Sequence, residues 1–291
     1  MSVAIKTAFD SWALPLPVTL ALLLITCVYL RGWLHLRKAF PHMISVAQFA
    51  AFISGVSALW LAIGSPVNAL DDELLTFHMV QHLLLMAVAP PLILLGAPIM
   101  PLLHGLPQRF VRGALGPIFR QRAVQWGEGF VTHPVFCLLA ASLAVIAWHY
   151  PPLFELGLKS SWWHEVEHAC FLTTGLLFWW PVVQPWPSVA RWPRWSTPLY
   201  LFLATLPCDA LSAFLAFCDR VVYLPYAAGP QLAGVSPLGD QEFAGALMWV
   251  CITFIYLIPA VVVTIQLLSS SRLHASEQGR PDWPCRSAEA P

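Results

Sequence analysis

The chain contains two pairs of histidines, and within each pair the two residues are four positions apart. His78 and His82 form the first pair, and His164 and His168 form the second. Residues with this spacing project from the same face of a helix, so each pair brings two imidazole rings together. Imidazole is the commonest metal-binding side chain, and it suits zinc, copper, iron and nickel. The spacing therefore predicts metal-binding pairs, provided that both segments are helical.

The composition is that of a membrane protein. Of the 291 residues, 58% are apolar and only 10% are charged, and the mean hydropathy is +0.68. A soluble domain carries about 25% charged residues, and a disordered chain needs low hydrophobicity, so both classes are excluded. The formal net charge is zero, which indicates no nucleic-acid partner. We expect an all-α integral membrane protein embedded in the lipid bilayer.

Seven stretches are long and apolar enough to cross a membrane, since a helical span needs about 20 mostly apolar residues. They are residues 14–33, 44–63, 74–96, 133–150, 162–183, 197–218 and 243–268. The segment 107–125 carries four arginines, so we expect an interfacial helix or loop there. The fold predicted is one seven-transmembrane helix bundle over residues 1–268. A flexible, polar cytoplasmic tail is expected over 269–291.

Prolines fall inside two of these spans. Pro90 and Pro91 lie in the third, and Pro207 lies in the sixth. Each removes a backbone donor and bends or breaks its helix. Gly245, in the seventh span, is expected to allow close packing against a neighbouring helix.

The distribution of basic residues predicts the orientation. With the N-terminus outside, 12 of the 15 Lys and Arg residues fall in cytoplasmic loops or the tail. The outer side then holds only Lys6, Lys159 and Arg220. Cytoplasmic loops carry an excess of Lys and Arg, so the N-terminus is expected outside, in the periplasm, and the C-terminus in the cytoplasm.

This topology brings five histidines to one depth. The first pair opens the third span, the second pair opens the fifth, and both spans run inward. The fourth span runs outward and ends at His149. Polar residues inside a span are costly and mark functional sites. His78, His82, His149, His164 and His168 are therefore predicted to form one metal-binding cluster near the outer face. The alternative is a set of interfacial histidines bonded to one another and to water.

Softer donors near the cluster favour copper. Met79 adjoins the first pair, and Met248 lies in the seventh span. Sulfur together with imidazole suits copper, most readily Cu(I), whereas zinc is the less favoured ion. Asp240 and Glu167 are the further accessory candidates. Asp240 also stands where an acid stabilises the start of its own helix, which is the competing interpretation of that residue.

Other chemistries fit parts of the pattern. The run from His164 to His168 matches H-E-x-x-H, in which two histidines bind zinc and Glu165 would activate water. Membrane proteases of this kind usually add an Asp-Gly element, whereas Asp209 is followed here by alanine. A bis-histidine haem or a copper oxidoreductase are further alternatives. A copper transporter would need a polar path through the membrane, and Asp209 is the only deep acid.

A wider set of motifs carries a family resemblance. These are His78-Met79-Val80-Gln81-His82, Ala89-Pro90-Pro91, Trp148-His149, His164-xxx-His168, Phe178-Trp179-Trp180-Pro181 and Asp240-Gln241-Glu242-Phe243-Ala244-Gly245. Together they resemble the CtaG-type cytochrome c oxidase assembly family, the multi-span class associated with caa3-type oxidases. The resemblance covers roughly residues 45 to 265. Relatives often have Asp-Gln-Gln where this chain has Asp-Gln-Glu.

The resemblance implies a non-enzymatic copper-handling role. A bacterial inner-membrane protein of this family is expected to assist metallation of the CuB site of a haem-copper oxidase. The oxidase subunit would be its partner, and periplasmic copper carriers are further expected partners. The five histidines correspond to the family's histidine positions. The chain does not resemble the single-span copper chaperone of the same name, which needs a Cys-X-Cys pair that this sequence lacks.

Overall fold

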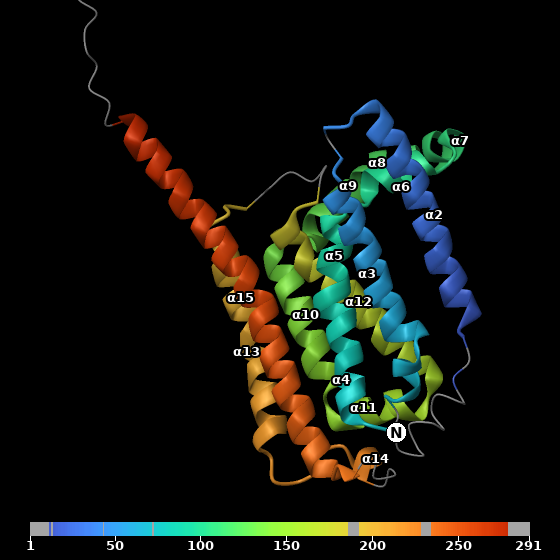
Figure 1. The fold of residues 1–291 in the computed structure, drawn as a ribbon, viewed down its shortest axis with the longest axis vertical. Helices are drawn as coiled ribbons and strands as arrows, with labels where there is room; N and C mark the ends of the chain where they lie inside the picture. The colour runs from blue at the N-terminus through green and yellow to red at the C-terminus, as the bar shows by residue number, and fades with distance from the viewer. Residues whose placement is uncertain are drawn as a thin grey trace, which may run out of the picture.

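The computed structural model describes residues 12, 14–42, 44–71, 73–185, 192–227 and 234–278. Within these residues all regular structure is helical, as predicted (Figure 1). The elements are α2 (Leu16–Ala39), α3 (Val46–Gly64), η1 (Pro66–Ala69), α4 (Leu75–Leu83), η2 (Leu84–Val88), α5 (Ala89–Leu95), α6 (Ile99–Gly105), α7 (Gln108–Phe110), η3 (Val111–Leu115), α8 (Gly116–Arg120), α9 (Arg122–Val131), α10 (Pro134–Trp148), α11 (Pro151–Lys159), α12 (Ser161–Val183), α13 (Ser196–Phe217), α14 (Leu224–Ala227) and α15 (Pro237–Gln278).

Six helical segments among the described residues are long and apolar enough to cross a membrane. A seventh is obtained if α9 and α10, which meet at a bend of 63°, count as one broken span. The predicted fourth span corresponds to α10, which has only 15 residues. Pro134 opens this helix and His133 caps it, accepting a hydrogen bond from the Val135 amide at 3.2 Å. Proline fits the first turn of a helix but cannot continue a preceding one, so the bend falls here.

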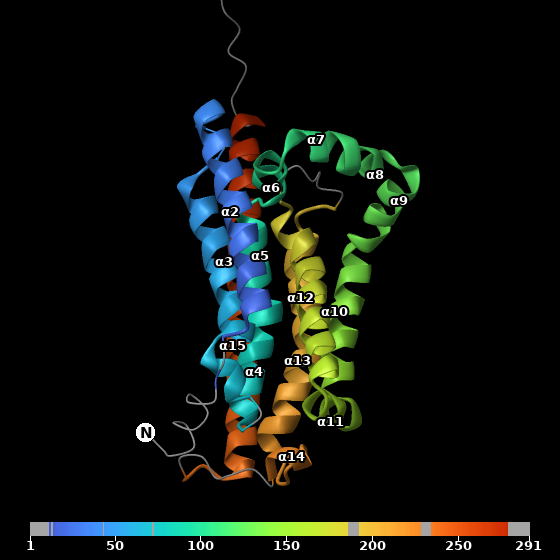
Figure 2. The same cartoon turned by 90° about the vertical axis from the view of Figure 1, so that its right-hand side faces the viewer.

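The arginine-rich segment is helical and does not cross the bundle. α7, η3 and α8 are short, and they lead into α9. Figure 2 shows α7, α8 and α9 running across one end of the bundle, where α2 also ends. Arg37 and Lys38 lie in the last turn of α2. The basic residues of these elements therefore gather at one end of the molecule.

The third span stays continuous in spite of its prolines. α4 passes through the π-helical turn η2 into α5, and the segment Leu75–Leu95 counts as one span. Pro90 has no N–H to donate to the carbonyl of Met86, four residues earlier. The indole Nε1 of Trp179, on α12, donates to that carbonyl at 3.1 Å. A side chain from a neighbouring helix thus replaces the missing backbone bond.

Close packing against α12 and α15 completes the bundle. A Cβ at Gly175 would lie 2.9 Å from Met86 Cα, so only glycine lets α12 approach η2 this closely. Gly245 has the same role between α15 and α13, where a Cβ would lie 2.8 Å from the Ala216 amide nitrogen. This confirms the packing predicted for Gly245. Pro207 lies inside α13, which continues through it.

The last helix is longer than expected. α15 continues to Gln278, past the predicted boundary at residue 268. Residues 269–278 are therefore helical, while residues 279–291 lie outside the described part of the chain. In Figures 1 and 2 the start of α15 lies at the same end of the bundle as α11 and α14. The start of α4 lies at this end too, opposite the basic end.

Candidate metal centre

The first histidine pair lies inside the bundle on α4. The His78 and His82 side chains are 1% and 3% exposed, and their ring centroids are 4.2 Å apart. The N-terminus of α4 is fixed by Asp240 of α15, whose carboxylate accepts hydrogen bonds from the Leu75 amide at 2.7 Å and the Thr76 amide at 3.3 Å. Asp240 therefore caps α4, and this fixes the start of the helix that carries both rings.

Glu167 of α12 faces both of these histidines. Its Oε1 lies 3.2 Å from His82 Nε2 and 3.8 Å from His78 Nε2. The three ligand atoms lie within 4.8 Å of one another, and all three side chains are buried. We call His78, His82 and Glu167 the inner triad. Two imidazoles and one carboxylate are a common donor set for a transition-metal ion.

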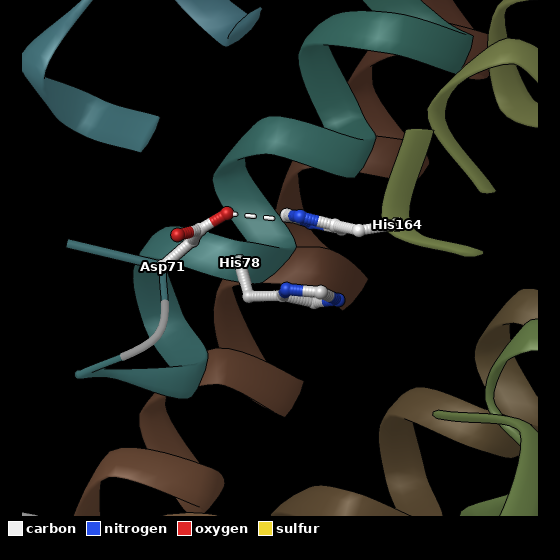
Figure 3. A group of neighbouring side chains, drawn as sticks. All are labelled: Asp71, His78 and His164. Atoms are coloured by element: carbon white, nitrogen blue, oxygen red, sulfur yellow. Dashed lines mark ion pairs between the residues drawn. The ribbon is translucent and has the colours of Figure 1, made fainter. Parts of the chain in front are cut away.

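A second group of ligands shares His78. Asp71, which precedes α4, places Oδ2 3.4 Å from Nε2 of His164 at the start of α12 (Figure 3). The ligand atoms of Asp71, His78 and His164 also lie within 4.8 Å of one another. We call these residues the outer triad. Its His164 side chain is 17% exposed, whereas no side chain of the inner triad exceeds 3%.

The remaining two histidines adjoin the triads. The His168 ring lies 4.2 Å from His164 and 6.4 Å from His82, measured between centroids. The His149 ring, at the end of α10, lies 5.6 Å from His82. The structure therefore brings all five predicted histidines together. Three belong to a triad, and His149 and His168 border them.

His149 forms a pair with Met79. Its Nδ1 lies 2.8 Å from the Val145 carbonyl oxygen, which can only accept, so Nδ1 carries the ring proton. In the neutral ring Nε2 then carries a lone pair, and this nitrogen lies 3.4 Å from the Met79 sulfur. A thioether sulfur also offers lone pairs. A soft thioether sulfur and an imidazole nitrogen that face each other in a buried site form a donor pair suited to copper.

The inner triad holds polar atoms that the protein leaves without hydrogen bonds. Six of its buried atoms have no hydrogen-bond partner among the described residues. They are both ring nitrogens of His78, both ring nitrogens of His82 and both carboxylate oxygens of Glu167. Within the inner triad the nearest contacts are those of Glu167 Oε1 with the two Nε2 atoms, at the distances given above. Buried polar atoms in folded proteins are nearly always satisfied. A bound cation would satisfy the lone pairs of all three side chains.

A comparison of the sequence with protein-family models identifies the family over most of the chain. A family model described as cytochrome c oxidase caa3 assembly factor (Caa3_CtaG) matches residues 27–270. The chain belongs to this family. All five histidines, Asp71 and Glu167 lie within the matched range. The description names an assembly role, in agreement with the expectation that the protein is not an enzyme.

Curated relatives of this caa3 assembly factor family member are uncharacterized proteins. One from Mycobacterium bovis is 27% identical over 268 residues, and one from Mycobacterium tuberculosis has the same identity and length of match. Each match covers 87% of this chain and 38% of the relative, and a Mycobacterium leprae protein is 26% identical over 257 residues. The chain thus spans well under half of each relative. No solved structure matches it.

The geometry of this family member does not fit a zinc protease. In H-E-x-x-H enzymes the glutamate next to the first histidine must face the metal. Here Glu165 is exposed on α12, while Glu167, two residues on, points into the inner triad. The carboxylate that approaches the histidines is therefore one that the motif does not specify.

Met248 and Asp240, the other accessory candidates, lie on α15. Met248 is buried in the hydrophobic core. Both carboxylate oxygens of Asp240 accept hydrogen bonds from the first turn of α4. Its interaction is with the helix that carries two of the histidines, rather than with the start of its own helix.

Sequence reasoning missed three residues that support the cluster. Asp71 was not among the predicted ligands, although an acid run immediately precedes the third span. Tyr226 donates its hydroxyl to the Asp71 carbonyl at 2.7 Å, and Tyr223 donates to the His149 carbonyl at 3.0 Å. Burial, and then the Glu167 carboxylate, raise the pKa of Tyr223 above its ordinary value, so it stays protonated as a donor. No local pattern marks these tyrosines.

Proposed function

We propose that this protein carries copper to a haem-copper oxidase during its assembly and assists metallation of the CuB site. The observation that carries the proposal is the inner triad, in which three buried ligands face one another without other hydrogen bonds. The assembly role follows from the family. The oxidase subunit would receive the ion within the membrane.

The donor set favours copper over zinc. Imidazole nitrogen binds both ions, but the soft Met79 sulfur, paired with His149 next to His82, favours copper, and Cu(I) in particular. Three protein ligands leave coordination positions open. An ion held in this way can accept a ligand from the client before it leaves the carrier. Such stepwise exchange is what a delivery protein requires.

The proposed setting is the bacterial inner membrane, with the histidine cluster at the periplasmic face. The basic residues of α2, α7, α8 and α9 gather at the opposite end of the bundle. Excess Lys and Arg face the cytoplasm in membrane proteins, which supports an outer N-terminus and a cytoplasmic C-terminus. Periplasmic copper carriers would then reach the cluster directly.

The test is metal analysis of the purified, full-length protein after anaerobic loading with Cu(I), and separately with Cu(II) or Zn(II). Glu167→Gln removes the carboxylate charge of the inner triad and keeps its shape. We expect the variant to bind copper at least about tenfold more weakly than the wild type, because removal of a charged ligand costs more than about 1.4 kcal/mol. Cells that carry it should assemble less active oxidase.

Glu165→Gln is the matched control, since it makes the same chemical change on an exposed position of the same helix. It should keep copper binding and oxidase maturation. Equal copper retention by the wild type and Glu167→Gln, or zinc bound in preference to copper, would overturn the proposal.

A further inference from the structure

His78 belongs to both triads, and this sharing is the starting point. With Glu167 and His82 it faces the interior of the bundle, and with Asp71 and His164 it faces the end where α4 begins. The His78 ring stacks on His164 with a centroid distance of 5.7 Å and an interplanar angle of 10° (Figure 3). It contacts His82 edge-on at 4.2 Å. One imidazole therefore separates two possible positions for an ion.

We infer that the outer triad is a separate entry position, and that His78 passes a captured copper ion from it to the inner triad. The inference rests on the proposed function. It adds that Asp71 and His164 control how fast the ion is captured. Glu167 and His82 control how firmly it is held.

Exposure gives the direction of the transfer. The His164 side chain is 17% exposed, so an arriving ion can reach a ligand of the outer triad. The inner ligands His82 and Glu167 are 3% and 1% exposed. Of the two groups, the outer triad is therefore the one that an arriving ion meets with an exposed ligand.

The two positions offer the ion similar ligands, so the transfer between them involves little change in free energy. Each triad offers two imidazole nitrogens and one carboxylate oxygen, so the ion exchanges one set of donors for an equal set. The bonds to Asp71 and His164 break, and bonds to His82 and Glu167 form. His78 provides a nitrogen ligand at both positions, and no electron is transferred.

Only one position is filled at a time. The two positions share His78, and the ligand atoms of each lie within 4.8 Å of one another, so two ions would be close neighbours. Like charges at such a distance in a buried site repel strongly. We therefore expect one copper ion per protein.

The test separates the rate of capture from the final affinity. Full-length protein in detergent is mixed anaerobically with Cu(I) supplied as its acetonitrile complex, and quenching of tryptophan fluorescence is followed over time. Asp71→Asn should load at least about tenfold more slowly, a barrier increase of about 1.4 kcal/mol. Its dissociation constant at equilibrium should stay within about twofold of the wild type. His164→Ala, at a half-buried helix start, should show the same pattern and serves as the second variant.

Two controls isolate the entry position. Asp219→Asn makes the same charge change at an exposed residue shortly after the end of α13 and should load at the wild-type rate. Glu167→Gln should capture copper as fast as the wild type but release it faster. Loading of Asp71→Asn at the wild-type rate, or an equilibrium loss as large as that of Glu167→Gln, would overturn the inference. Failure of the wild type to bind copper would instead overturn the proposed function.

Discussion

The Glu167 carboxylate is confined on both sides. Oε1 faces the two histidines of the inner triad, whereas Oε2 faces Gly157 on α11. A Cβ built on Gly157 would lie 2.8 Å from Oε2, closer than such atoms normally approach. The absence of one side chain on α11 thus sets the position of a ligand on α12. Ligand positions that depend on a neighbour in this way are sensitive to small changes.

Gly157→Ala is predicted to weaken copper binding without unfolding the protein. The added methyl group displaces the carboxylate, and disturbing a residue that orients a ligand typically costs about 10- to 100-fold in metal affinity. Alanine also favours helix over glycine by up to about 1 kcal/mol, so the melting temperature should not fall. Copper affinity and thermal unfolding measure the two effects.

Gly127→Ala in α9 is the control, because a Cβ there meets nothing within 4 Å. It should gain the same helix preference and keep copper binding. Unchanged copper affinity in Gly157→Ala would mean that the carboxylate can move aside at no cost.

At the scale of helices, α15 determines where α4 begins. Asp240 accepts hydrogen bonds from two amides of the first turn of α4, and it is 6% exposed. Gln241 accepts a bond from the Val222 amide at 2.7 Å and donates to the Leu215 and Arg220 carbonyls. Adjacent residues thus tie α15 to α4 and to the segment after α13. The Asp-Gln part of the motif is a junction between helices.

Asp240→Ala is predicted to destabilise the start of α4. Loss of a helix cap costs about 0.5–2 kcal/mol, and the His78 and His82 rings lie within the first turns that follow. We therefore expect a lower melting temperature and weaker copper binding. Glu242→Ala, two residues on and exposed, is the matched control and should change neither. A variant that lost stability but bound copper with wild-type affinity would show that the cap does not position the rings.

The whole molecule has two chemically different ends. One carries the arginine-rich helices α7 to α9, and the other carries the starts of α4 and α15 together with α11 (Figure 2). The proposed orientation places the first end in the cytoplasm. Lys159, 67% exposed, closes α11 at the opposite end. Exposed positions at both ends are therefore available for labelling.

Single cysteines in a cysteine-free background test this orientation. Lys159→Cys is expected to react with a membrane-impermeant maleimide in intact cells. Ala123→Cys, exposed on α9, should react only after the membrane is permeabilised. The reverse pattern of labelling would show that the histidine cluster faces the cytoplasm and would exclude delivery from the periplasm.

Local properties of the sequence determined the helical fold and the histidine pairs. Each predicted apolar stretch corresponds to a helix or a continuous helical run in the structure, because a span must satisfy its own backbone bonds in lipid. The spacing of four residues places both rings of a pair on one face wherever the segment is helical. The bend before α10 was not predicted. Residues on both sides of it are helical, in α9 and in α10, and only the structure shows the angle at which the two helices meet.

Contacts between distant segments decided the rest, and only the tertiary structure contains them. Leu75 and Asp240 are 165 positions apart, so no local pattern shows that the acid caps α4. Glu165 and Glu167 are the same residue type two positions apart, and the packing of α12 against α4 and α11 places Glu167 inside. Asp71 became a ligand candidate only when α12 brought His164 beside it. Helix periodicity determines which side chains share a face, whereas packing determines what that face meets.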